Sequence, residues 1–129
     1  MTIATDAVHA GEPDPRISGS VVMPIFQSAM FVHAGTNDYA ATKYIRLSNT
    51  PNHDALAKRI ATLEGAEAAI VSASGMAAIS TAMLAVLRAG DHVVVLDGLY
   101  GGTRMFAEHL LPRFGIEATF ADPLDASTW

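Results

Sequence analysis

The pattern of hydrophobic and polar positions changes near residue 50. Before this point glycine and proline interrupt the chain repeatedly, and no helical or strand period lasts more than a few residues. The segment is nevertheless too apolar for a disordered tail. Its hydrophobic positions include Val21, Val22, Ile25, Phe26, Met30, Phe31 and Val32. We therefore expect residues 1–50 to form an extended arm that buries itself against another surface, such as a neighbouring subunit.

A helical pattern covers residues 52–64. The apolar stripe of this helix consists of Leu56, Ile60 and Leu63. Thr50 is a suitable N-cap, and Pro51 suits the first helical position because its missing N–H would have no partner there. Gly65 is suited to the left-handed conformation that ends a helix.

Short apolar strands and longer helical segments alternate after residue 65. The pattern predicts strands at 68–71, 92–96 and 116–120, and helices at 76–88 and about 103–111. The strand at 92–96 is almost continuously apolar and the helix at 76–88 is apolar nearly all round, which indicates burial on two sides. The predicted fold class is therefore α/β, with a mostly parallel sheet and helices on both faces. Because three strands make a very small sheet for such a fold, we expect residues 51–129 to be the first part of a larger domain.

Charge and composition exclude several classes of function. The net charge is −5, and the chain has no basic run that could displace counterions from nucleic acid. The chain has no cysteine, which excludes disulfides and thiolate metal sites, and its five histidines lack metal-ligand spacing. The longest apolar run, residues 76–87, is too short to span a bilayer, and the amino terminus lacks the pattern of a secretory signal. We expect a soluble cytoplasmic protein without a metal site, a nucleic-acid partner or a membrane partner.

The turn Ser72–Met76 is the first candidate for chemistry. Its small residues lie between a predicted strand and a helix that begins at or just after Ser74. The free N–H groups and positive dipole end of such a helix favour an anion, most often phosphate, although a plain strand-to-helix junction is the alternative. The turn is not a Walker loop, and Gly75 stands alone where a dinucleotide fingerprint needs three glycines. Because Asp97 lies about where a ribose-binding acid is expected, a dinucleotide-binding fragment remains an alternative.

Two further motifs combine an aromatic ring with polar or flexible neighbours. Tyr100-Gly101-Gly102-Thr103 lies at the carboxyl end of a predicted strand, where α/β proteins bind ligands. Tyr100 could lay its ring on a planar cofactor, and a mobile surface turn is an equal alternative. Tyr44 and Arg46 would point the same way in an extended segment, and Arg46 could bind phosphate or carboxylate. A surface charge beside a packing tyrosine is the simpler interpretation of that pair.

Taken in order, these motifs resemble one family, the pyridoxal-phosphate enzymes of cysteine and methionine metabolism. The matching motifs are Val8-His9-Ala10-Gly11, Pro24-Ile25-Phe26-Gln27, Tyr44-Ile45-Arg46 with Asn49, Leu63-Glu64-Gly65, Ser74-Gly75-Met76-Ala77-Ala78-Ile79, Gly90-Asp91 and Tyr100-Gly101-Gly102-Thr103. The family includes the cystathionine γ-synthases, γ-lyases and β-lyases, and methionine γ-lyase. The resemblance implies an aspartate-aminotransferase-like large domain of fold type I and pyridoxal 5'-phosphate as cofactor. It also implies a small amino-acid substrate and self-association into a homodimer or homotetramer.

The resemblance assigns a role to each candidate residue. The residues that match the phosphate-binding turn, through their backbone amides, are Ser74, Gly75 and Met76. Tyr44 and Arg46 match the pair that reaches the phosphate from the neighbouring subunit, which implies an active site at a dimer interface. Tyr100 matches the tyrosine that stacks on the pyridine ring and takes part in proton transfer, and it is the one candidate catalytic residue.

The chain also departs from the family pattern. Many members read Asn-Pro-Thr where this chain reads Asn49-Thr50-Pro51-Asn52. Neither Lys43 nor Lys58 matches the lysine that binds the cofactor covalently, and the pyridine-pairing aspartate and carboxylate-binding arginine also have no match. We therefore expect the amino-terminal portion of a trans-sulfuration enzyme, a carbon–sulfur lyase or synthase acting by β/γ-elimination or replacement on cystathionine or a related amino acid. By itself it should not complete the reaction. The alternative is a non-catalytic, stand-alone α/β module or remnant.

Overall fold

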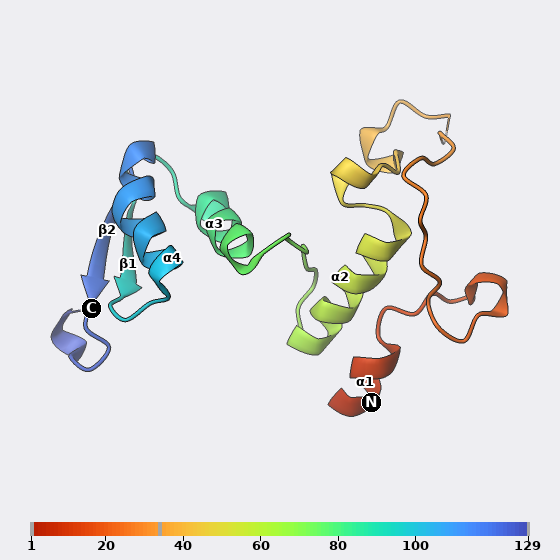
Figure 1. Cartoon of the computed structure of the whole chain (residues 1–129), viewed down its shortest axis with the longest axis horizontal. Helices are drawn as coiled ribbons and strands as arrows, with labels where there is room; N and C mark the ends of the chain where they lie inside the picture. The colour runs from red at the N-terminus through yellow and green to blue at the C-terminus, as the bar shows by residue number, and fades with distance from the viewer. Residues whose placement is uncertain (1, 34, 129) are drawn as a thin grey trace. The chain divides into compact units, whose positions relative to one another are not determined.

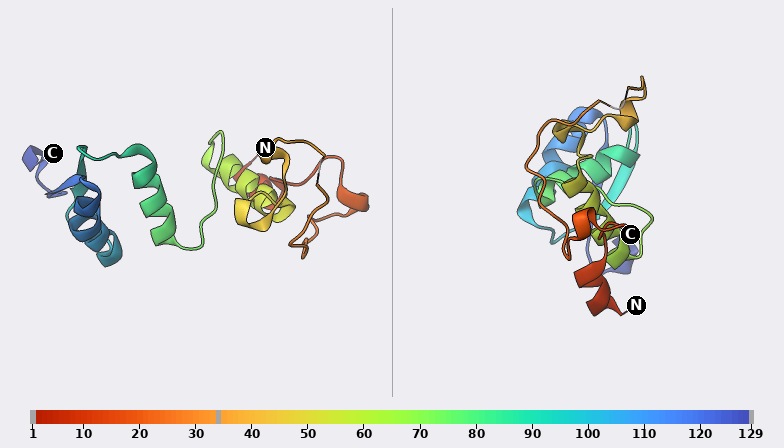
Figure 2. Two further views of the ribbon diagram at one scale, coloured as in Figure 1. Left: turned by 90° about the horizontal axis from the view of Figure 1, so that it is seen from above. Right: turned by 90° about the vertical axis from the view of Figure 1, so that its right-hand side faces the viewer.

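The structure of the chain is a computed structural model that describes residues 2–33 and 35–128. The chain forms two compact units, residues 1–71 and residues 72–129. Figures 1 and 2 show the helices and strands of each unit. The first unit contains helices α1 (Ile3–His9) and α2 (Pro51–Glu64) and 3₁₀ turns at Ile17–Gly19, Tyr39–Ala41 and Ile45–Leu47. The second unit contains α3 (Gly75–Val86), β1 (His92–Leu96), α4 (Gly101–Met105), a π-helical turn (Phe106–Leu110), a 3₁₀ turn (Leu111–Phe114), β2 (Glu117–Ala121) and a 3₁₀ turn at Ala126–Thr128.

Helix α2 confirms the helix predicted after residue 50. Pro51 occupies its first turn, and Gly65 ends it in the left-handed conformation with a φ of 63°. Thr50 occupies the predicted N-cap position, but its side chain does not cap the helix backbone. The Thr50 hydroxyl instead bonds to Nδ1 of His53 at 2.7 Å, within the first turn of α2.

Helix α1 lies in the segment for which we predicted an extended arm, and this short helix corrects that prediction. It has seven residues, from Ile3 to His9, and the Thr2 hydroxyl accepts a hydrogen bond from the Thr5 amide at its start. Such a short helix is marginal by itself, and its stability depends on contacts with the rest of the fold. Helix α1 contacts α2, which explains why the pattern of the arm alone did not predict it.

Polar side chains of α2 hold the backbone of the arm. Arg59 donates from Nε to the Ala10 carbonyl at 2.7 Å and from Nη2 to the Val8 carbonyl at 3.1 Å. Asn52 accepts a hydrogen bond from the Phe26 amide at 3.0 Å and donates to the Phe26 carbonyl at 2.7 Å. These side chains satisfy backbone groups of the arm that have no strand partner.

Gly11 marks the closest approach of the arm to α2. Its φ is 80°, and a Cβ at this position would lie 2.4 Å from the carbonyl oxygen of Ala55. The same Cβ would lie 3.3 Å from the backbone nitrogen of Arg59. Both the positive φ and the proximity of helix backbone therefore require glycine here.

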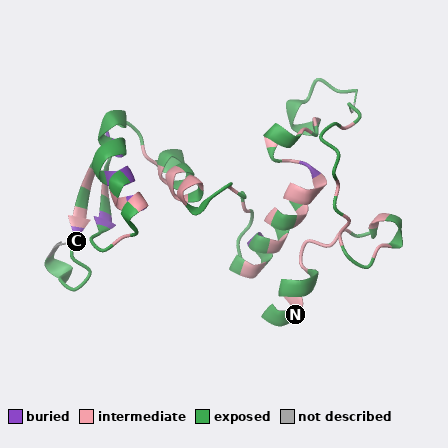
Figure 3. Cartoon of the chain, in the orientation of Figure 1, coloured by how far each residue is buried: buried purple, intermediate pink, exposed green. Residues whose placement is uncertain are grey.

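The second unit is built on a parallel pair of strands. β1 pairs with β2 in a register that runs from His92 opposite Glu117 to Leu96 opposite Ala121. This arrangement confirms the predicted parallel sheet, although β2 begins one residue later than the predicted strand. The buried apolar cluster consists of Val95, Phe106, Ala107, Leu111 and Ile116. Figure 3 shows the buried residues of this unit on the strands and on the helical segment that connects them.

The helical segment between the strands is longer than predicted. It continues past Pro112 because a 3₁₀ turn follows the π-helical turn and accepts proline near its start. Gly115 ends the segment with a φ of 72° and accepts a hydrogen bond from the Gly90 amide at 2.8 Å.

The strand predicted at residues 68–71 does not form. Among the described residues no segment pairs with it, and Ile70 is 83% exposed. A strand requires hydrogen bonds to a neighbour, which a favourable apolar pattern cannot supply by itself. The expected burial on two sides is also not observed, since α3 has no buried residue and Val94 of β1 is 46% exposed. Two paired strands offer too little surface to bury all of these apolar side chains.

Replacing Gly11 should destabilise the protein more than replacing a glycine with the same backbone conformation. Gly19 is the matched control, since its φ is 73° and no atom lies within 4 Å of a Cβ placed there. We expect Gly19→Ala to lower the free energy of unfolding by about 1 kcal/mol through backbone strain. Gly11→Ala also pushes against the α2 backbone and should lower it by about 3 kcal/mol. Urea denaturation measures both, and equal losses would contradict the described packing of the arm on α2.

Candidate active site

The beginning of α3 presents unpaired backbone donors. Ser74 is the N-cap, and its hydroxyl oxygen accepts a hydrogen bond from the Ala77 amide at 3.1 Å. Its carbonyl accepts from the Ala78 amide at 3.0 Å. Among the residues that the structure describes, none accepts a hydrogen bond from the amides of Gly75 and Met76. Nothing lies within 4 Å of a Cβ placed on Gly75. The turn is therefore open and has two amides that fit an anionic group such as phosphate.

Tyr100 lies at the carboxyl end of β1, after the loop 97–99. It is the N-cap residue of α4, and its carbonyl accepts hydrogen bonds from the amides of Thr103 at 2.9 Å and Arg104 at 3.1 Å. The side chain is 74% exposed, so most of its surface is accessible to a ligand. This position agrees with the general rule that α/β proteins bind ligands beyond the carboxyl ends of their strands.

Met76 brings the beginnings of α3 and α4 together. The hydroxyl of Thr103, a residue that is only 5% exposed, donates to the Met76 sulfur at 3.7 Å. The Met76 sulfur would lie 3.1 Å from a Cβ placed on Gly102, and the Tyr100 ring carbon Cε1 would lie 2.7 Å from the same point. The predicted phosphate turn and Tyr100 therefore lie next to each other within the second unit.

Arg104 holds the loop after β1 against α4. Its guanidinium pairs with Asp97, lies 4.5 Å from the Phe120 ring centroid, and approaches Glu108 at 3.5 Å. Asp97 therefore already has a cationic partner, which counts against the ribose-binding role that the dinucleotide alternative requires.

Tyr44 and Arg46 lie in the first unit and contact each other. The Arg46 guanidinium carbon is 4.7 Å from the Tyr44 ring centroid, a cation–π distance. The segment forms a 3₁₀ turn after Tyr44 and is not extended, so the condition under which the two side chains would point the same way is not met. Asn49 stabilises this turn, because its Oδ1 accepts from the Tyr44 amide at 3.0 Å and its Nδ2 donates to the Thr42 carbonyl at 2.7 Å.

Three residues near the candidate site have contacts that the sequence did not predict. Asn49, Gly102 and Thr103 entered only as members of motifs. An asparagine side chain beside a turn commonly forms hydrogen bonds to nearby backbone groups, so the role of Asn49 could have been predicted from the sequence. The contact of Thr103 with Met76 spans 27 residues and has no signal in the sequence.

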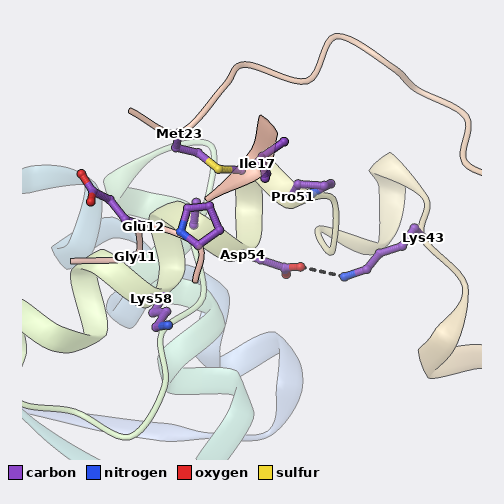
Figure 4. Close-up of a pocket in the computed structure, with 10 residues that line it drawn as sticks. Gly11, Glu12, Ile17, Met23, Lys43, Pro51, Asp54 and Lys58 are labelled. Carbon is purple, nitrogen blue, oxygen red and sulfur yellow. Dashed lines mark hydrogen bonds and ion pairs between the residues drawn. The ribbon is translucent and has the colours of Figure 1, made fainter. Parts of the chain in front are cut away.

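A hollow of about 270 Å³ lies between the arm and α2 in the first unit, and Figure 4 shows its lining. None of the predicted cofactor residues lines it. Its carboxylates already have partners, since Asp54 pairs with Lys43 at 2.7 Å and Glu12 pairs with Arg16 at 3.1 Å. We therefore do not assign a ligand to this hollow.

Two structural features are absent from the described part of the chain. No group of three or more potential metal-ligating side chains occurs among the described residues. None of the helices described there has the length and apolar character needed to cross a bilayer.

Comparisons with known proteins agree with the resemblance. A family model described as "Cys/Met metabolism PLP-dependent enzyme" matches residues 4–129. A cystathionine beta-lyase from Bacillus subtilis is 42% identical over 124 residues, which cover 96% of this chain and 31% of that protein. An L-methionine gamma-lyase from Fusobacterium nucleatum subsp. polymorphum is 42% identical over 128 residues, covering 93% of this chain and 32% of that protein.

A solved structure gives the same result for the fold. The crystal structure of cystathionine gamma-lyase from Lactobacillus plantarum, complexed with L-serine, matches with a TM-score of 0.84 and 32% identity. The match covers 99% of this chain and 33% of that chain. The chain therefore spans about a third of the length of the relatives that it matches.

The role of Asn49 can be tested by stability measurements. We expect Asn49→Ala to lower the free energy of unfolding by about 2 kcal/mol, because two partly buried backbone groups lose their partner. Asn49→Asp keeps the acceptor for the Tyr44 amide and should lose less. Asn37 is an exposed control whose side chain makes no hydrogen bond among the described residues, so Asn37→Ala should change stability by less than about 0.5 kcal/mol. Thermal or urea denaturation that finds Asn49→Ala as mild as Asn37→Ala would contradict this role.

Proposed function

Because the chain belongs to the family of Cys/Met metabolism PLP-dependent enzymes, we propose that the turn at 74–76 and Tyr100 form part of the pyridoxal 5'-phosphate (PLP) site of a carbon–sulfur lyase or synthase. The observation that carries the proposal is the open turn with the unpaired amides of Gly75 and Met76. The same turn contacts the segment that carries Tyr100, so donors for a phosphate and an aromatic ring for a planar group lie together.

Each residue of this set has a distinct task in the proposal. The amides of Gly75 and Met76, together with the helix dipole of α3, bind the phosphate. Ser74 keeps the turn in shape by capping the helix. The Tyr100 ring orients the cofactor by stacking, and its hydroxyl holds a proton close to the substrate. When bound, PLP acts as the electron sink for carbanion chemistry at the substrate.

We propose that Tyr44 and Arg46 bind the cofactor phosphate of a neighbouring subunit. In this proposal residues 1–50 are the arm that reaches the neighbouring subunit. Residues 51–129 are then the beginning of the cofactor-binding domain. Among the described residues Arg46 has no carboxylate partner, so its hydrogen-bond donors are available. Guanidinium groups bind phosphate through paired, charge-assisted hydrogen bonds. This assignment requires a homodimer or a homotetramer.

The proposed substrates are cystathionine or a related sulfur amino acid, and the proposed reaction is β/γ-elimination or replacement. Relatives described as a cystathionine beta-lyase and an L-methionine gamma-lyase support this class of substrate. The candidate second function, a stand-alone α/β module without catalysis, predicts a folded protein that binds no PLP.

PLP binding tests the assignment of the phosphate turn. In the protein that carries this chain, Ser74→Ala removes the cap of α3 and should weaken PLP binding about fivefold. Arg46→Ala removes charge-assisted donors and should weaken it by about 10- to 100-fold. The control is Ser80→Ala, because the Ser80 hydroxyl donates to the Ala77 carbonyl within α3 and, among the described residues, to no other group.

Titration followed by the absorbance of bound PLP measures these affinities. If the wild-type protein binds no PLP, the stand-alone alternative replaces the proposal. If Ser74→Ala and Ser80→Ala bind PLP equally, the turn is not the phosphate site.

Removing the Tyr100 hydroxyl should separate binding from proton transfer. Tyr100→Phe keeps the ring, so we expect PLP affinity within about twofold of the wild type, whereas kcat for cystathionine should fall at least about 100-fold. Tyr39, which is 72% exposed in the first unit, supplies the control variant Tyr39→Phe. Steady-state kinetics with both variants provides the measurement. An unchanged kcat in Tyr100→Phe would exclude the hydroxyl from the reaction.

A further inference from the structure

We infer that Gly102 is a positioning residue for Tyr100, because only a residue without a side chain leaves room for the ring at this place on α4. The inference rests on the proposed PLP site, in which Tyr100 stacks on the cofactor. Gly102 itself touches neither cofactor nor substrate in this proposal, and it acts through the tyrosine.

The geometry around Gly102 shows what its missing side chain permits. A Cβ at this position would lie 2.7 Å from Cε1 and 3.3 Å from Cδ1 of the Tyr100 ring. It would also lie 3.1 Å from the sulfur of Met76. The φ of Gly102 is outside the left-handed region, so the backbone itself would accept alanine. The requirement for glycine therefore comes from the neighbouring side chains.

Tyr100 is the neighbour that an added methyl group would displace. Its side chain is 74% exposed, so the ring can turn away into solvent. Met76 is less free, because its sulfur accepts a hydrogen bond from the buried Thr103. Since alanine also favours a helix over glycine, Gly102→Ala should keep or raise the stability of the fold while it moves the ring.

Gly101 provides a matched control on the same turn of α4. It is the preceding residue, it also has no positive φ, and nothing lies within 4 Å of a Cβ placed there. Gly101→Ala therefore makes the same chemical change without touching the Tyr100 ring.

The first experiment measures PLP affinity in the protein that carries this chain. Gly102→Ala should raise the Kd for PLP about five- to tenfold, and Gly101→Ala should change it less than about twofold. In a Tyr100→Ala background, Gly102→Ala should cause no further loss, because the ring through which it acts is gone. Equal Kd values for the two alanine variants would overturn the inference, as would an equal loss in the Tyr100→Ala background.

Two further measurements need no cofactor. Thermal unfolding should show Gly102→Ala at least about as stable as the wild-type protein, and a Tm clearly below that of the wild type would assign Gly102 a structural role instead. In protein labelled at the methionine methyl groups, Tyr100→Ala should shift the Met76 methyl NMR signal by removing the nearby ring. Gly102→Ala should shift the same signal and Gly101→Ala should not. In the Tyr100→Ala background, where only the direct effect of the added methyl group on the sulfur 3.1 Å away remains, Gly102→Ala should shift the signal less. The assignment of the signal comes from Met76→Leu.

These measurements distinguish the inference from the proposed function. If the wild-type protein binds no PLP, the PLP site is wrong, and the Met76 methyl signals alone decide whether Gly102 positions the ring. The inference is overturned, even in a protein that binds PLP well, if Gly102→Ala leaves the Met76 signal unchanged or shifts it equally in the Tyr100→Ala background.

Discussion

The parallel pairing of β1 with β2 is the constraint on which the second unit depends. Parallel strands need a crossover connection, since the chain must return to the end from which the first strand began. The connection here is helical, and it buries Phe106 and Leu111 beside Val95 of β1. Because the connection starts where β1 ends, the pairing also determines that Tyr100 and α4 begin at the carboxyl end of the strand.

The candidate site follows from this arrangement through one methionine. Met76 belongs to the turn that offers unpaired amides, and its sulfur is held by Thr103 of α4. The same sulfur lies beside Gly102, over which the ring of Tyr100 also passes. A helix start that fits a phosphate and an aromatic ring that fits a planar group are therefore positioned by shared contacts, and not by two independent loops.

The first unit depends on a different kind of interaction. Its arm has little regular structure, and side chains of α2 supply partners for its backbone, above all Arg59 and Asn52. Large apolar side chains of the arm remain exposed, including Val32 at 98% and Ile25 at 84%. Exposed apolar surface often marks a contact with another part of a protein or another subunit. This surface agrees with a chain that spans about a third of the length of its relatives.

Structural features that depend on residues close together in the sequence could be predicted from the sequence alone. The ends of α2 follow from Pro51 and Gly65, and the bounds of β1 match the apolar run at 92–96. The start of α3 next to Ser74 follows from its small residues and the long apolar segment behind it. The resemblance to a family, carried by short motifs in order, also needed no structure.

Contacts between distant residues came only from the tertiary structure. Helix caps and hydrophobic periodicity depend on residues within one or two helical turns of each other. Strand formation also depends on whether a partner strand is present. Residues 68–71 therefore have the sequence pattern of a strand but do not form one. The bonds from Arg59 to the arm and from Thr103 to Met76 join residues far apart in sequence, and local propensity carries no information about them. The residue types in the site were therefore evident from the chain, but their spatial relationship was set by which segments meet in the fold.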